Sequence, residues 1–149
     1  MLTAVLISIF KRDLEKLKKE IGLYKKESTI WLTGKEVPNS AGNLCLHLIG
    51  NLNTYIGKEL GGTNYVRNRD LEFSQKDIVS GELIEKVEAT ANTVANALYK
   101  LKQEDLEKDY PVMVFENNMS TEYFLVHLTA HLAYHLGQIN YHRRFFDTD

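Results

Sequence analysis

Apolar residues recur at helical spacing in four long stretches of the chain, and these stretches are the predicted secondary-structure elements. They cover about residues 2–30, 40–60, 80–101 and 120–146. The first and third stretches are amphipathic, because lysines and glutamates largely cover the side opposite the apolar one. Four helices of this length fit an all-α, up-down four-helix bundle, which we expect to form one domain over residues 1–149.

The second and fourth stretches differ from the others because they are almost free of charged residues. No Asp, Glu, Lys or Arg occurs between Val37 and Gly57, or between Glu122 and Arg143. A helix without charges but with one polar edge is expected to be buried, and its polar groups then need partners inside the protein. The most economical arrangement turns the polar edges of these two helices toward each other.

The polar edge of the last helix is a stripe of histidines. At 100° per residue, His127, His131, His135 and His142 fall within an arc of about 80°. Gln138 lies inside the same arc. Chemistry is therefore to be sought on this edge of the helix.

The polar edge of the second helix is narrower and contains a single histidine, His47. Asn43 lies one turn before it and Asn51 one turn after it. These two amides, like Gln138 on the last helix, are candidates to orient a histidine ring or to bind a substrate. The alternative is that buried amides simply satisfy one another.

Histidines four residues apart on a helix can bind one metal ion from the same face. His131 and His135 have this spacing, and so do His127 and His131. All three cannot share an ion, because His127 and His135 are about 12 Å apart along the axis. A further ligand must come from another helix, and His47 is the obvious candidate. Three histidines leave a position for water or substrate, as in catalytic rather than structural metal sites.

The simpler alternative is that these histidines are ordinary core or surface side chains that bind no metal. Neither polar edge carries a carboxylate, which disfavours a di-iron centre built from glutamates. The residues between His131 and His135 are Leu-Ala-Tyr, which disfavours a zinc protease with an adjacent catalytic glutamate.

Composition and charge narrow the classes of partner. The net charge of −2 argues against a nucleic-acid surface. A single cysteine, Cys45, excludes an internal disulfide and fits a reducing compartment. The apolar start, residues 1–10, lacks a basic n-region and a cleavage site, so we interpret it as the start of a helix. We therefore expect a cytoplasmic protein with no nucleic-acid or membrane partner.

Residues 61–73 are expected to form a loop between the second and third helices. This loop contains Arg67 and Arg69 among aromatic residues. The two arginines are candidates to contact an anionic substrate at the mouth of the bundle. Solvation or ordinary salt bridges are the alternative.

Two segments resemble the DinB/YfiT-like superfamily of metal-binding four-helix bundles. They are Ala41-Gly-Asn-Leu-Cys-Leu-His47-Leu-Ile-Gly-Asn-Leu52 and His131-Leu-Ala-Tyr-His135-Leu-Gly-Gln138-Ile139. The Tyr65-Val-Arg-Asn-Arg-Asp-Leu-Glu-Phe73 segment is similar to one uncharacterised branch of it. The resemblance implies a divalent ion, zinc or nickel, held by His47, His131 and His135. It implies that His127 does not bind the ion, and that this residue either has no role in the site or contacts one of the ligand residues.

Characterised members of that superfamily are thiol S-transferases that use bacillithiol, and a mycothiol-dependent maleylpyruvate isomerase. The resemblance thus implies a metal-dependent enzyme in which an activated low-molecular-weight thiol, or water, attacks a small electrophile. It also allows a homodimer. Two alternatives stay open: a non-enzymatic bundle that binds a metal or a small ligand in a stress response, and a metal-dependent hydrolase that uses the same histidines.

Overall fold

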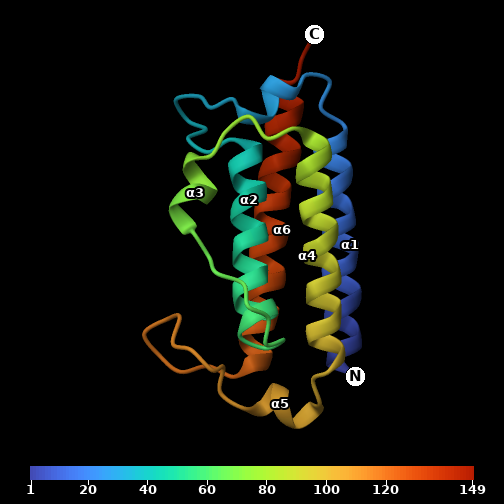
Figure 1. Cartoon of the computed structure of the whole chain (residues 1–149), viewed down its shortest axis with the longest axis vertical. Helices are drawn as coiled ribbons and strands as arrows, with labels where there is room; N and C mark the ends of the chain where they lie inside the picture. The colour runs from blue at the N-terminus through green and yellow to red at the C-terminus, as the bar shows by residue number, and fades with distance from the viewer.

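The computed structural model of the protein describes residues 1–149, and it is all-helical, as predicted. Its four long helices lie side by side (Figure 1). They are α1 (Leu2–Gly22), α2 (Ala41–Leu52), α4 (Ser80–Tyr99) and α6 (Thr121–Phe146). The shorter elements are the 3₁₀-helix η1 (Glu27–Trp31), the π-helical turn η2 (Asn53–Lys58), α3 (Arg69–Ser74) and α5 (Gln103–Glu107).

The order of helix directions differs from the simple alternation expected. Helices α1 and α6 run in one direction, whereas α2 and α4 both run in the other (Figure 1). Residues 59–79, here called the crossover segment, leave the end of η2 and return along the outside of the molecule to the start of α4 (Figure 1). A long connection of this kind allows consecutive helices to be parallel, whereas a short loop forces them to be antiparallel.

The helix boundaries follow local signals except at the end of α1. Ser120 caps α6 by accepting a hydrogen bond from the backbone N–H of Tyr123. Helix α1 ends at Gly22 instead of continuing to residue 30. The carboxylate of Asp147 accepts hydrogen bonds from the backbone N–H groups of Lys25 and Lys26, at 2.6 and 3.3 Å. This contact with the other end of the chain stabilises a turn at these residues in place of another helical turn.

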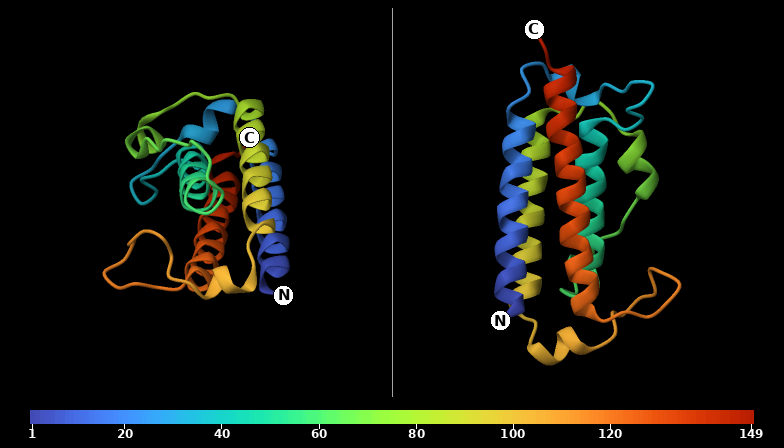
Figure 2. Two further views of the ribbon diagram at one scale, coloured as in Figure 1. Left: turned by 60° about the horizontal axis from the view of Figure 1, so that its bottom comes forward. Right: turned by 180° about the vertical axis from the view of Figure 1, so that it is seen from behind.

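The two charge-free helices are buried to different extents. In α2 every residue except Ile49 is buried, as expected. The outer face of α6 is not buried, because Tyr134 and Tyr141 are 65% and 71% exposed. Seen from behind, α6 lies in front of the other helices along most of its length (Figure 2, right). The expectation for α6 is wrong because a lack of charge does not require burial when the outer positions are tyrosine, alanine and glycine, which tolerate water.

A single cluster of 28 buried hydrophobic residues forms the core, and most of them come from the four long helices. It includes Leu48 and Leu52 from α2, and Leu128 and Leu132 from α6. These residues flank the polar edges of the two helices and fix their relative rotation, so that His47 faces the histidine stripe. None of the helices combines the length and the apolar character that crossing a membrane requires.

Candidate metal centre

Three histidine rings converge where α2 and α6 face each other. The Nε2 atom of His131 lies 3.3 Å from Nε2 of His47 and 3.2 Å from Nε2 of His135. The ligand atoms of the three residues all lie within 4.8 Å of one another. His47 is buried and the other two side chains are half-buried. The structure thus brings together the three residues that the sequence indicates as metal ligands.

The second nitrogen of two of these rings has a fixed hydrogen-bond acceptor. Nδ1 of His47 lies 3.1 Å from Oε1 of Glu72, and Nδ1 of His135 lies 2.7 Å from Oε1 of Gln138. A carboxylate or amide oxygen accepts, so each Nδ1 carries the proton and donates it. In the neutral rings, Nε2 of both residues therefore presents a lone pair toward His131.

The single N–H of neutral His131 cannot bridge both of its close nitrogen–nitrogen contacts. Nε2 of neutral His131 can donate to only one of its two neighbours, so at least one close nitrogen–nitrogen contact has no proton between its atoms. Nδ1 of His131 is buried and has no hydrogen-bond partner. With the proton of His131 on Nδ1, three unprotonated Nε2 atoms converge, and these are the donor set that a cation needs.

Lowered pKa values keep His131 and His47 unprotonated at neutral pH. Burial, with smaller contributions from the neighbouring His135 and His47, lowers the pKa of His131 to about 4. Burial also lowers the pKa of His47, although the nearby Glu72 opposes this shift. Both rings are therefore neutral at pH 7, which is the state that binds a metal.

The geometry fits a divalent ion that prefers nitrogen ligands. Zinc–nitrogen bonds of about 2.0–2.1 Å in a tetrahedral site separate two ligand nitrogens by about 3.3 Å. The observed separations of 3.3 and 3.2 Å agree with this value. No fourth His, Cys, Asp or Glu joins the group. Three protein ligands leave room for an exogenous ligand, which distinguishes catalytic from structural sites.

Sequence reasoning missed Glu72, which reaches the site from α3. Its buried carboxylate contacts Nδ1 of His47 and also pairs with Arg67, whose Nε and Nη2 atoms donate at 2.8 and 3.0 Å. A carboxylate that holds the distal nitrogen of a histidine ligand is a common support for metal sites. Arg67 therefore forms the salt bridge that was the alternative to an anion-binding role.

Asn43 holds the crossover segment in place and contacts none of the histidine rings. Its Nδ2 donates to the backbone carbonyls of Glu72 and Gln75 at 2.9 and 2.8 Å. Asn68 caps α3 by accepting a hydrogen bond from the N–H of Leu71. These contacts fix α3 against α2 and thereby place the carboxylate of Glu72 beside His47.

The remaining candidates lie outside the cluster. The ring of His127 lies 6.5 Å from that of His131 and packs between Phe115 and Phe124. Asn51 is buried, but its Oδ1 has no hydrogen-bond partner.

Two further polar residues take no part in the site. Arg69 is exposed and forms no ion pair. Cys45 is fully buried on the opposite side of α2, and burial raises the pKa of its thiol to about 12. A thiol in this environment is not a nucleophile at neutral pH.

The absence of a side chain at Gly50 allows the carboxylate of Glu72 to pack closely against this face of α2. A Cβ atom at Gly50 would lie 1.9 Å from Oε2 of Glu72. We expect Gly50→Ala to displace Glu72 from His47 and to lower zinc affinity by about 10-fold, the lower bound for losing a supporting contact. A competition titration with a chromogenic chelator measures this change.

Gly137→Ala is the matched control for Gly50→Ala. A Cβ atom at Gly137 meets no atom within 4 Å, so this variant should keep its zinc affinity. It should also be slightly more stable, because alanine is the better helix former. Equal zinc affinity in Gly50→Ala and wild type would show that Glu72 does not support His47.

The depressed pKa of His131 predicts that the metal-free protein is labile to acid. Below the unfolded value of 6.5, the unfolded chain takes up a proton at His131 that the folded chain refuses until about pH 4. The free energy of unfolding should therefore fall as the pH drops from 6.5 toward 4. Melting temperatures of chelator-treated protein at pH 7 and pH 5 test this, and His131→Gln should show the smaller decrease. A decrease of the same size in both proteins would contradict the assignment.

Comparison with known proteins identifies a family but no function. The model of a family described as "Protein of unknown function (DUF1572)" matches residues 4–149. None of the curated proteins matches the sequence.

Proposed function

We propose that this chain, which belongs to the DUF1572 family, is a metal-dependent enzyme of the thiol S-transferase kind. The observation that carries the proposal is the convergence of three histidine nitrogens without a fourth protein ligand. A closed structural site would use a fourth side chain, whereas an open one accepts a thiol or water. The side-by-side packing of the four long helices supports placing the chain among the DinB/YfiT-like four-helix bundles.

The metal in this proposal is zinc or nickel, held by His47, His131 and His135. Such an ion lowers the pKa of a coordinated thiol, so that thiolate is available at neutral pH. Glu72 and Gln138 keep the Nδ1 protons of His47 and His135 in place, so that both Nε2 atoms stay free to bind.

The overall reaction forms one bond to sulfur and breaks one bond in the electrophile. The thiol gives its proton to solvent, its sulfur bonds to the electrophilic carbon, and the leaving group departs with the bonding electron pair. No side chain of the three-histidine cluster is free to take the thiol proton once a metal is bound, so solvent is the acceptor. The protein residues position the reactants and hold the ligand tautomers.

The test is conjugation of bacillithiol to monochlorobimane by protein loaded with zinc or nickel, followed by fluorescence. We expect thiol-dependent turnover in wild type and in His127→Ala, because His127 lies outside the cluster. Turnover should be lost in His131→Ala and in chelator-treated protein. Hydrolysis of ester or amide substrates without a thiol would favour the hydrolase instead. Bound metal without turnover of either kind would favour the non-enzymatic bundle.

A further inference from the structure

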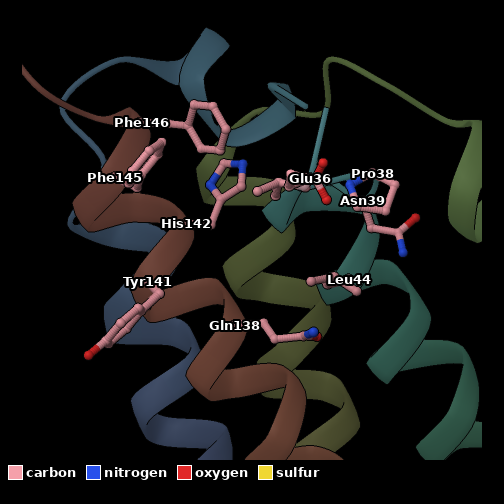
Figure 3. A pocket seen from close by; sticks show the side chains of 10 residues that line it. Glu36, Pro38, Asn39, Leu44, Gln138, Tyr141, His142, Phe145 and Phe146 are labelled. Carbon is pink, nitrogen blue, oxygen red and sulfur yellow. The ribbon is translucent and has the colours of Figure 1, made fainter. Parts of the chain in front are cut away.

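A cavity of about 360 Å³ opens near the C-terminal end of α6 (Figure 3). It lies between α6, the start of α2 and the loop that contains Glu36. Leu44 extends into it from α2, and Gln138 and His142 extend into it from α6 (Figure 3). The volume is within the range that proteins use for small-molecule ligands.

Most of the cavity wall is apolar, and His142 does not offer a free polar group. Phe145, Phe146 and Leu44 supply apolar side chains. Nε2 of His142 donates to the backbone carbonyl of Leu32 at 2.9 Å, which leaves Nδ1 to accept from the hydroxyl of Tyr24 at 2.7 Å. Burial lowers the pKa of His142, so the ring carries no charge at pH 7. This histidine contributes the face of a neutral ring to the wall.

Three polar groups at the cavity remain without partners in the protein. They are the carboxylate of Glu36, the amide of Asn39 and the Nε2 amide of Gln138, which lie on exposed side chains at the rim and take part in no hydrogen bond or ion pair within the protein. The only formal charge among the residues of the wall at neutral pH is the negative charge of Glu36. An anionic ligand would meet this carboxylate and no cation, whereas an amine or hydroxyl group would find an acceptor.

Gln138 connects this cavity to the candidate metal centre. Its Oε1 accepts the hydrogen bond from Nδ1 of His135, while the other end of the same amide lies at the cavity. None of the three clustered histidines lines the cavity, but Gln138 follows His135 by less than one helical turn, about 4.5 Å along the axis. A ligand held here would therefore lie next to the residue that holds the ring of His135.

We propose that this cavity binds a small, ring-bearing compound that is uncharged or cationic and carries an amine or hydroxyl group. The apolar wall would hold the ring, and Glu36 with Asn39 would accept hydrogen bonds from the polar group. That this compound is the electrophilic substrate rests on the proposed function. Binding in the cavity requires neither metal nor turnover.

The test uses three probes of one shape, benzylamine, benzyl alcohol and benzoate, titrated into metal-free protein and followed by ¹H–¹⁵N NMR. We expect benzylamine and benzyl alcohol to bind in the millimolar range and to shift the amide signals of Gln138, Tyr141 and Phe145. Benzoate should bind at least about 10-fold more weakly, because it meets the Glu36 carboxylate without a cation. Glu36→Gln should reduce the preference for benzylamine over benzoate.

Two exposed aromatic residues of α6 provide matched variants. Phe145 lines the cavity and is 76% exposed, whereas Tyr134 lies outside it and is 65% exposed. Phe145→Ala should weaken benzylamine binding several-fold, and Tyr134→Ala should leave it unchanged. Benzoate binding as tight as that of benzylamine, or shifts confined to other surfaces, would overturn the proposal.

Different results would overturn the proposed ligand of the cavity and the proposed enzymatic function. Metal-dependent thiol transfer without probe binding would overturn only the cavity assignment. Probe binding in a protein that shows no thiol transfer would leave the cavity assignment intact and overturn the enzymatic one.

Discussion

In the His131→Ala variant we expect metal binding to be lost almost completely. Both short nitrogen–nitrogen contacts of the cluster end on Nε2 of His131, so its removal leaves His47 and His135 without the atom that lies between them. Removing a group that only supports a ligand costs 10–100-fold in affinity, and removing a ligand should cost more than about 100-fold. Elemental analysis of untagged protein after zinc or nickel loading measures this, with about one ion per chain expected in wild type.

His127→Ala is the control for this experiment, because it removes a histidine from the same stripe of α6 but from outside the cluster. It should retain the metal. His135→Ala provides a second loss-of-ligand variant that does not depend on how well His131→Ala folds. Metal bound by His131→Ala at the wild-type level, or its absence from wild type after loading, would exclude the site.

The second large effect is expected for Glu72→Ala. This change leaves the guanidinium of Arg67 without its only ion-pair partner in a largely buried position, with 14% of its side chain exposed. Breaking a buried pair by removing one partner costs about 3 kcal/mol of unfolding free energy. His47 also loses the acceptor for Nδ1, so we expect zinc affinity to fall by 10–100-fold. Urea denaturation and zinc competition titration measure the two effects.

A double variant separates stability from metal binding. Replacing both Arg67 and Glu72 with leucine removes the charges together, which should recover much of the lost stability. Zinc affinity should stay low, because His47 still lacks an acceptor. Recovery of affinity together with stability would show that Glu72 acts only through folding and does not position His47.

Helix periodicity predicted only part of the histidine cluster. It places His127, His131 and His135 on one face of α6 and allows either neighbouring pair as ligands, and the resemblance to the DinB/YfiT-like superfamily selects His131 and His135. His47 could be added because it is the only histidine on the narrow polar edge of α2. The position of Glu72 could not be predicted, because no local pattern relates a short helix in a connection to a face of α2. Gly50 was the available signal, since a glycine in the middle of a buried helix indicates that another group approaches closely.

The parts of the fold that sequence reasoning missed depend on contacts between distant residues. The end of α1 is determined partly by Asp147, which accepts hydrogen bonds from the backbone at Lys25 and Lys26. The parallel direction of α2 and α4 depends on the course of the crossover segment. An amphipathic pattern shows which face of a helix is buried, but not in which direction the helix runs through the fold. Local patterns therefore predicted which residues form helices better than where those helices end or how they are connected.

The crossover segment is loosely packed for a segment that supports the site. Of residues 59–79, only Glu72 and Ile78 are buried, whereas the helix that it supports, α2, is almost wholly buried. Segments with few buried contacts open locally at a small fraction of the free energy of global unfolding. Amide hydrogens of this segment should therefore exchange with solvent long before those of α2. Each opening removes the acceptor from His47, so the lifetime of a bound ion would be determined by the opening of this segment and not by unfolding of the four helices.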